Sequence, residues 1–227
     1  MNYIVAGSKS WNKKVFDEVV SSYEGKWIYV DTEKGLIEKA KLYNPRYIFF
    51  LHWSWIVPNE IVEYYECVCF HMADVPYGKG GSPLQNLIAR GHKETKLTAL
   101  RMVEQLDAGP VYLKEDLSLY GSSAEEIYIR SSYLSAKMIK KIIENDIMPK
   151  SQTGKELLFK RRKYEESEIS TLHDLESLFD FIRMLDAEGY PKAFLLYEKF
   201  KLEFSRVAIY NGKLLADVKI TRKGEKE

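Results

Sequence analysis

Short runs of apolar residues alternate with longer amphipathic segments along the first two thirds of the chain. The run 46–51 is rich in Ile and Phe and has no alternating polar positions. A strand that is buried on both faces has this composition, so the run predicts a strand of a parallel sheet that helices cover. Comparable short strands are predicted at 3–6, 26–30, 67–70, 98–103 and 111–117.

Helices are predicted in the intervals between these strands. Their expected ranges are 15–23, 32–43, 59–65 and 82–91. The last has the clearest ends, because Ser82 can cap free N–H groups, Pro83 suits the first helical position and Gly91 can end the helix. Strands that alternate with helices in this order predict an open α/β domain of Rossmann type with a mostly parallel sheet.

A long helix is predicted to begin at Ser122 and Ser123. Two overlapping capping boxes mark its start, one of Ser122 with Glu125 and one of Ser123 with Glu126. Its apolar positions recur at helical spacing and form one stripe: Ile127, Leu134, Met138, Ile142 and Ile143. This helix is expected to close a main domain of residues 1–148.

Residues 149–227 are expected to form a small α+β extension, because the composition changes after Pro149. A linker carries the basic run 160–163, which is either a solvated segment or a surface for phosphate groups. A helix capped by Thr171 follows, and then three strands are predicted at 193–197, 202–210 and 214–220.

The last two strands are joined by Asn211 and Gly212, a strong hairpin signal. The hairpin strands are also candidate contacts for a homodimer, although such an edge can equally pack within its own domain.

Composition describes a globular chain, with 45% hydrophobic and 30% charged residues among 227. Lys and Arg number 34 against 33 Asp and Glu, a net charge of +1, which argues against nucleic acid as the main partner because phosphate contacts need a cationic excess or patch. The start of the chain lacks the pattern of a signal peptide, and the longest apolar run, 47–51, is too short to span a bilayer. A cytoplasmic protein without a membrane partner is expected.

Cys67 and Cys69 are two apart in a predicted strand, so their side chains point the same way. Such a pair is poorly placed for a disulfide, and no His or Cys partners stand at zinc spacing. The sequence therefore predicts reduced cysteines and no metal.

A histidine and an aspartate stand at the ends of two predicted strands. His71 follows one strand, Asp107 follows another, and a glycine-rich loop and a helix separate them. This arrangement suggests a general base that a carboxylate holds in orientation. Glycines 78, 80 and 81 let the loop backbone approach a substrate, and Lys79 among them is either a solvated lysine or a mobile cation for the substrate.

Two other features leave a functional and an ordinary interpretation open. The turn Gly7–Ser10 after the first strand can hold an anion on free N–H groups, or simply connect strand and helix. His52 follows the strand 46–51, where ligands gather in such sheets, but a histidine beside Trp53 and Trp55 is more often structural.

The stretch 71–83 reads H-M-A-D-V-P-Y-G-K-G-G-S-P and resembles the H-P-S-L-L-P-x-Y-R-G-x-x-P loop of folate-dependent formyltransferases. The segment 106–110, L-D-A-G-P, is similar to their L-D-x-G motif at the right distance downstream, and 56–58 resembles the segment before their catalytic strand. The likeness covers residues 1–148.

The resemblance implies 10-formyltetrahydrofolate as co-substrate and a primary amine as acceptor. It implies His71 as general base or as the cation that stabilises the oxyanion, and Asp107 as its partner in proton transfer. Implied cofactor-binding positions, largely through backbone groups, are Trp55, Ile56, Val57, Val68, Cys69, Val103, Glu104, Gln105 and Leu106. Implied substrate-binding positions are Tyr77, Gly78, Lys79, Gly80, Gly81 and Ser82.

The chain departs from the family pattern at Cys69, where the family has an Asn aimed at the formyl oxygen. A thiol is a poor hydrogen-bond donor, and loss of one oxyanion donor costs about 100- to 1,000-fold in rate. Cys69 is therefore the third candidate catalytic residue, and a catalytically weak relative that binds a folate or a sugar nucleotide is an alternative.

The acceptor is suggested by the C-terminal part. The segments around 159–169 and 182–194 resemble the extension of sugar N-formyltransferases, including those of pseudaminic-acid pathways. This likeness implies the amine of a nucleotide-linked amino sugar. The alternative is an enzyme similar to methionyl-tRNA formyltransferases, in which a basic C-terminal domain would be expected.

Overall fold

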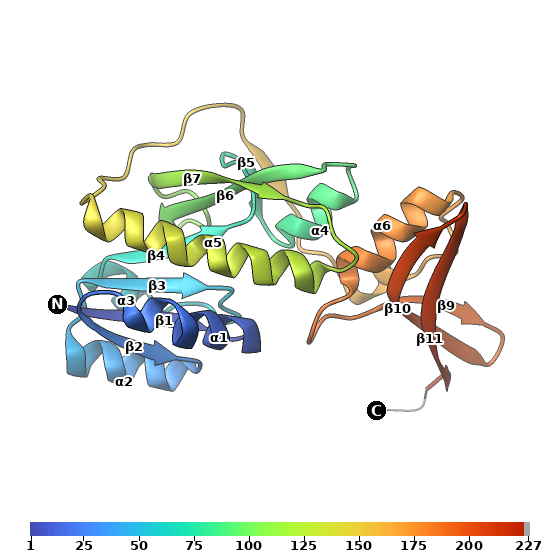
Figure 1. The fold of residues 1–227 in the computed structure, drawn as a ribbon, viewed down its shortest axis with the longest axis horizontal. Coiled ribbons are helices and arrows are strands. Elements are labelled where there is room, and N and C mark those ends of the chain that lie inside the picture. Colours follow the sequence, from blue (N-terminus) through green and yellow to red (C-terminus); the bar gives the residue numbers. More distant parts are fainter. Residues whose placement is uncertain (225–227) are drawn as a thin grey trace. The chain divides into compact units, whose positions relative to one another are not determined.

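The computed structural model describes residues 1–224 of the chain (Figure 1). Two compact units can be distinguished by their internal contacts. The first unit comprises residues 1–80, 95–117 and 128–158, and the second unit comprises residues 81–94, 118–127 and 159–227. The border between residues 148 and 149 stays a prediction of the sequence.

A six-stranded sheet of order β2-β1-β3-β4-β6-β7 organises the first unit. Its strands are β1 (Asn2–Gly7), β2 (Lys26–Val30), β3 (Tyr47–Leu51), β4 (Cys67–His71), β6 (Glu94–Arg101) and β7 (Val111–Ser118). β1 pairs in parallel with β2 and β3, and β3 pairs in parallel with β4, whereas β6 is antiparallel to β4. The predicted mostly parallel sheet of a Rossmann-like α/β fold is confirmed.

Helices cover both faces of this sheet. They are α1 (Ser10–Glu18), α2 (Glu33–Tyr43), α3 (Asn59–Tyr64) and α5 (Ala124–Glu144). On one face Ile48 and Phe50 of β3 share a core cluster with Leu36 of α2 and Ile61 of α3. Toward the other face, the buried amide of Asn12 in α1 donates to the Ser132 hydroxyl of α5.

All five residues of β3 are buried, which explains why the run shows no polar alternation. Each fully buried large apolar side chain contributes about 1.5–3 kcal/mol relative to an exposed one, so the central strands stabilise the unit strongly.

Two predicted elements, the helix 15–23 and the strand 98–103, lie earlier in the chain than expected. The helix begins at Ser10 because the N–H groups of Asn12 and Lys13 both bond to the carbonyl of Lys9 directly after β1. β6 ends at Arg101, after which the N–H of Met102 bonds to the carbonyl of Cys67. These boundaries follow from backbone partners, which side-chain pattern does not specify.

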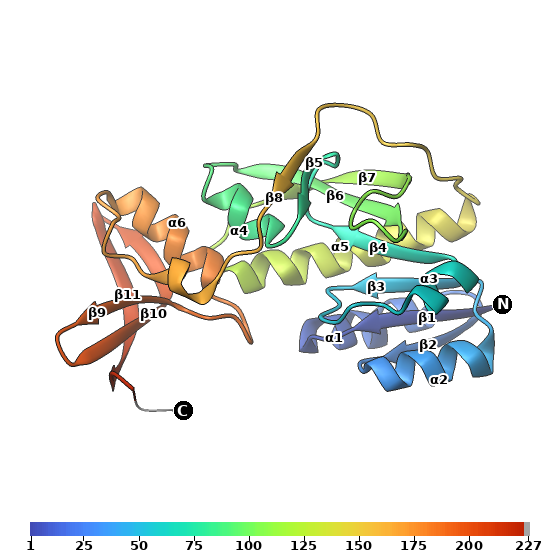
Figure 2. The same cartoon turned by 180° about the vertical axis from the view of Figure 1, so that it is seen from behind.

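One short strand pair lies where the sequence predicts a loop and a linker. β5 (Tyr77–Gly80) and β8 (Leu157–Phe159) form a two-stranded sheet, and Figure 2 shows them side by side. Glycine is depleted in strands, and the two segments are far apart in sequence. The pairing is therefore a tertiary feature that the sequence of neither segment predicts.

The second unit contains α4 (Pro83–Ile88), α6 (Leu175–Leu185) and a short 3₁₀ turn at Tyr164–Ser167. Ser82 does not cap α4 as predicted, because its backbone is left-handed, with φ 50°. Its hydroxyl instead accepts a 3.1 Å hydrogen bond from the N–H of Arg162. Thr171 is likewise not the cap of α6, whose N-terminus is bound by the carboxylate of Asp174.

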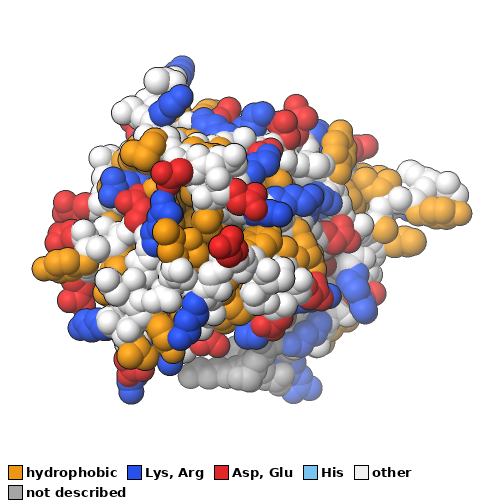
Figure 3. All heavy atoms as spheres, turned by 60° about the vertical axis from the view of Figure 1, so that its left-hand side comes forward, with side chains coloured by type: hydrophobic (Ala, Val, Ile, Leu, Met, Phe, Trp, Pro, Cys, Tyr) orange, Lys and Arg blue, Asp and Glu red, His pale blue; other side chains and the backbone are white. Residues whose placement is uncertain are grey.

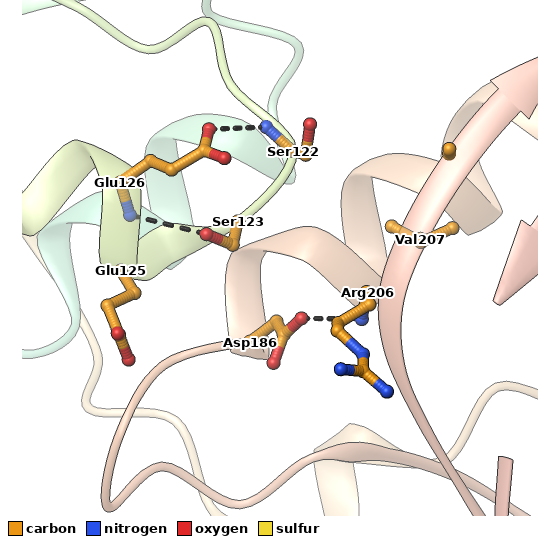
Figure 4. Close-up of a pocket in the computed structure, with 8 residues that line it drawn as sticks. Ser122, Ser123, Glu125, Glu126, Asp186, Arg206 and Val207 are labelled. Carbon is orange, nitrogen blue, oxygen red and sulfur yellow. Dashed lines mark hydrogen bonds between the residues drawn. The ribbon is translucent and has the colours of Figure 1, made fainter. Parts of the chain in front are cut away.

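The start of α5 forms half of one of the two predicted capping boxes (Figure 4). The Ser123 hydroxyl accepts from the N–H of Glu126, but the Glu126 carboxylate accepts from the N–H of Ser122 and not from that of Ser123. Glu125 instead accepts a 2.8 Å hydrogen bond from the N–H of Glu188. A cavity of about 430 Å³ lies beside this helix start, where Asp186 binds the N–H of Arg206.

The second unit ends in a three-stranded antiparallel sheet of order β11-β10-β9. Its strands are β9 (Ala193–Tyr197), β10 (Phe200–Tyr210) and β11 (Lys213–Arg222). Asn211 and Gly212 both have positive φ, 48° and 70°, so the predicted hairpin turn is confirmed. β11 is an edge strand on which Val218 and Ile220 are 45% and 61% exposed.

Candidate active site

The last residue of β4, His71, and Asp107 in the loop after β6 lie beside one another. Nδ1 of His71 is 3.5 Å from Oδ2 of Asp107, and the two side chains are only 9% and 8% exposed. The structure therefore brings together the two residues that the sequence singled out, and their chemical roles stay predictions.

The hydrogen bonds of His71 indicate where its protons lie. Nε2 is 2.7 Å from the carbonyl oxygen of Gly78. A carbonyl oxygen can only accept, so Nε2 carries a proton. Nδ1, 3.5 Å from Oδ2, is therefore the ring nitrogen that faces the Asp107 carboxylate.

β5 binds both members of this pair through its backbone. The carbonyl of Gly78 accepts from His71, and the N–H of Gly80 donates to Oδ2 of Asp107 over 2.9 Å. Both glycines have positive φ, 80° and 98°, a conformation that other residues adopt only with strain. The glycines of the loop thus hold the side chains of both His71 and Asp107.

The loop that carries Asp107 is strained and tightly packed. Asp107 has φ 53°, in the left-handed region. A Cβ on Gly109 would lie 1.8 Å from the carbonyl oxygen of Arg101, so only glycine fits there. The loop is held in one conformation by its surroundings, as strained backbone at functional sites usually is.

Cys69 lies on the same face of β4 as His71, two residues before it. Burial raises the pKa of the Cys69 thiol well above its ordinary value, and the negative charge of Asp107 raises it further. Cys69 is therefore a neutral thiol at physiological pH and not a thiolate nucleophile.

Lys79 is not the mobile loop cation that the sequence allowed. It lies in β5, its side chain is only 10% exposed, and Nζ is 2.9 Å from Oε1 of Glu156. A partner that is distant in the sequence fixes it. Its contact with a substrate stays a prediction.

The positions implied for the cofactor divide into exposed and buried groups. Trp55, Ile56, Val103 and Leu106 are 40%, 90%, 39% and 70% exposed, so their side chains are open to a ligand. Val57 and Val68 are buried, so only their backbone groups are available to a ligand. Glu104 and Gln105 are exposed on the loop before Asp107.

The implied substrate-binding residues also divide. Tyr77 to Gly80 form β5, whereas Gly81 and Ser82 belong to the second unit. There the N–H of Gly81 donates to the carbonyl of Phe159. A Cβ on Gly81 would lie 2.5 Å from Cα of Arg161, so this glycine admits the basic run 160–163 against its backbone.

The sequence missed a contribution from residues 150–158. The side-chain amide of Gln152 donates to the carbonyls of Asp107 and Gly109, and Glu156 pairs with Lys79. The sequence predicts a linker for these residues, because polar residues without periodicity give no signal of a helix or strand. Only the folded chain shows that they border the site.

His52 has the environment of a structural residue. Its ring packs edge-on against Tyr128 at 4.5 Å and against Trp11 at 5.7 Å. Burial, together with the smaller effect of the charge of Lys9, lowers the pKa of His52 to about 4. The turn before α1 contacts the His52 backbone, since the Ser8 hydroxyl donates to the His52 carbonyl.

Neither a metal cluster nor a membrane span is found among residues 1–224. No group of three or more His, Cys, Asp or Glu residues within them is arranged to hold a metal ion. No helix in that part of the chain combines the length and apolarity that crossing a membrane requires. On the face in Figure 3, Lys and Arg side chains are interspersed with Asp and Glu.

Family models and curated relatives show what the chain is similar to. The family model described as formyl transferase matches residues 12–143, and the model of the methionyl-tRNA formyltransferase C-terminal domain matches residues 164–221. A methionyl-tRNA formyltransferase of Thermodesulfovibrio yellowstonii is 24% identical over 200 residues, covering 85% of this chain and 64% of its own length. The chain thus spans less than two thirds of this curated relative.

Solved structures show the same likeness over the whole chain. A structure named as methionyl-tRNA formyltransferase from Clostridium thermocellum is 49% identical, with a TM-score of 0.94, and the match covers 98% of this chain and 99% of that one. A sugar N-formyltransferase from Shewanella has a TM-score of 0.65 at 14% identity, over 100% and 99% of the two chains, and shows the fold alone.

Proposed function

Because the chain belongs to the formyl transferase family, we propose that it transfers a formyl group from 10-formyltetrahydrofolate to a primary amine. The observation that carries the proposal is the buried pair of His71 and Asp107, 3.5 Å apart, on the two segments that resemble the family's motifs. The proposal covers the activity, the donor and the acceptor.

The positions that the family resemblance implies for the donor suit its chemistry. The side chains of Trp55, Ile56, Val103 and Leu106 are apolar and exposed, so each could contact a flat, partly apolar ring system. The donor supplies the formyl carbon when it is bound. The residues of the chain would then orient the donor and transfer the proton.

His71 and Asp107 would act on protons and charge. The attacking amine must lose a proton as its nitrogen bonds to the formyl carbon, and negative charge grows on the formyl oxygen. Nε2 of His71 is occupied by the Gly78 carbonyl, so the proton must move through Nδ1 or the Asp107 carboxylate. His71 and Asp107 can then return the proton to the folate nitrogen as the bond between this nitrogen and the formyl carbon breaks.

Cys69 is the weak point of this mechanism. The neutral thiol is a poor donor to a formyl oxygen, and its environment opposes ionisation. A relative that binds a folate or a sugar nucleotide with little turnover is therefore the rival proposal, and the substitution of Cys69 discussed below tests it.

Methionyl-tRNA is the acceptor that the relatives' names support. The 49% identical structure and the curated relative are both named methionyl-tRNA formyltransferases. In the run 160–163, the exposed cations of Lys160, Arg161 and Lys163 offer groups that could meet phosphates. Transfer to the amino group of the methionyl residue would be the reaction.

A nucleotide-linked amino sugar is the second candidate acceptor. It is supported by the net charge of +1, by the mixed charges in Figure 3 and by the likeness around 159–169 to sugar N-formyltransferases. A small acceptor needs no extended cationic surface, whereas tRNA does.

One experiment separates these acceptors. Purified protein is mixed with 10-formyltetrahydrofolate and either methionyl-tRNA or a panel of UDP- and CMP-linked amino sugars. Release of tetrahydrofolate and an acceptor heavier by one formyl group are expected with one class only. Absence of turnover with every acceptor, together with no folate binding by calorimetry, would refute the proposed function.

A further inference from the structure

Residues 150–158 run along the loops that carry the candidate acid and base. Lys150 exchanges backbone hydrogen bonds of 2.7 and 2.8 Å with Val111, and the N–H of Leu157 donates to the carbonyl of Pro76. Between these anchors, Glu156 binds Lys79 and Gln152 binds the loop of Asp107. The segment is fixed at both ends and in its middle.

Gln152 makes the contact nearest to the reacting groups. Its Nε2 donates to the carbonyl of Asp107 at 2.7 Å and to the carbonyl of Gly109 at 2.8 Å. The amide can take only this orientation, because rotating it by half a turn would place Oε1 against two carbonyl oxygens. Gln152 is thus a double donor to the backbone of one loop.

The Asp107 loop has a physical reason to need such a donor. Asp107 is a residue with a Cβ in the left-handed region, at φ 53°, and relaxation of that strain would rotate its side chain. The same side chain accepts from the N–H of Gly80 and faces Nδ1 of His71. A backbone rotation at Asp107 would therefore break both contacts.

We infer that Gln152 is a positioning residue of the formyl-transfer site, which holds the Asp107 backbone so that its carboxylate faces His71. This role rests on the proposed function. Gln152 acts through Asp107 and touches no reacting atom, so its loss should lower kcat and leave the KM for the folate donor unchanged.

The test uses three substitutions in the full-length protein. Gln152→Leu removes both donors, and Gln152→Glu keeps the shape of the side chain but has no donor when ionised. Thr153→Leu, at the exposed neighbouring position, is the matched control. Both Gln152 variants should lower kcat about 10- to 100-fold, as small misplacements of catalytic groups do, while Thr153→Leu stays within about twofold of the unchanged protein.

A double-mutant cycle separates positioning from general stability. In an Asp107→Asn background, Gln152→Leu should cause no further loss of kcat, because the group through which it acts is already disabled. If the fold-decrease in kcat from Gln152→Leu multiplied that from Asp107→Asn, the inference would be overturned. An unchanged kcat in both Gln152 variants would also overturn it.

A measurement without substrate keeps this test independent of the proposed function. Protein labelled with ¹⁵N-histidine reports the protonation and tautomer of His71 by NMR across a pH titration. Gln152→Leu and Gln152→Glu should shift the His71 signals, and Thr153→Leu should not. Unshifted signals refute the positioning role even if formyl transfer is found, and shifted signals support it even if no acceptor is formylated.

Discussion

At the residue scale, the chemistry depends on how His71 uses its two nitrogens. Nε2 is committed to the carbonyl of Gly78, and only Nδ1 faces Asp107. The Asp107 carboxylate can therefore orient the imidazole from its Nδ1 side. Neither residue should work well without the other.

His71→Ala and Asp107→Ala should each lower kcat by about 100- to 10,000-fold, the usual contribution of a positioned acid or base. Because the two residues are expected to act as a unit, the double variant should be little worse than either single one. Steady-state kinetics with the identified acceptor measure this, and circular dichroism verifies folding. Activity retained in both single variants would mean that the site lies elsewhere.

Cys69→Asn should raise kcat about 10-fold or more, because an amide can donate to the formyl oxygen where the thiol donates poorly. Cys69→Ala is the control and should stay within about twofold of the unchanged protein. A fall in kcat on Cys69→Asn would show instead that the site is adapted to the thiol.

At the element scale, His52 links β3 to two helices. Its ring packs edge-on against both Trp11 of α1 and Tyr128 of α5, and burial is the main cause that lowers its pKa to about 4. The ordinary pKa of histidine is about 6.5, so the unfolded chain binds a proton between these values and the folded chain does not. Stability must fall as the pH falls through this window.

The free energy of unfolding is expected to drop by up to about 3 kcal/mol between pH 6.5 and pH 4 on account of His52 alone. Carboxyl groups titrate in the same range, so the comparison is with His52→Asn. The backbone of His52 is left-handed, with φ 50°, a conformation that asparagine tolerates. Urea unfolding at several pH values measures the difference. An equal pH dependence in both proteins would contradict the assignment.

At the scale of the whole molecule, the edge strand β11 of the second unit presents an apolar surface. Val218 and Ile220 are 45% and 61% exposed on one face of the sheet, and neighbouring β10 adds Phe200 at 41%. Apolar side chains grouped on an edge strand are typical of an interface. The expectation of a homodimer is tied to these positions.

Ile220→Lys should weaken self-association, because a charge would be buried in the contact. Thr221→Lys, which points to the opposite face of β11, is the control. Light scattering after size-exclusion chromatography measures the molar mass of both variants. A wild-type protein that is monomeric at every concentration tested would contradict the proposed interface.

The amino-acid pattern by itself determined the fold class, the hairpin at Asn211 and Gly212, and the meeting of His71 with Asp107. These features depend on local signals: buried runs such as 46–51, a turn that needs positive φ, and motifs at the ends of strands. The family also followed from those motifs, which the matches over residues 12–143 support.

Tertiary structure alone decided how the site is held. The pairing of β5 with β8, the ion pair of Lys79 with Glu156 and the two hydrogen bonds from Gln152 all join segments far apart in the chain. The glycine-rich stretch 77–80 and the polar linker 150–158 are both predicted to be irregular from sequence. Each is ordered only by backbone hydrogen bonds and charges that its partner segment supplies. Such contacts exist only once the chain has folded, so no local pattern encodes them.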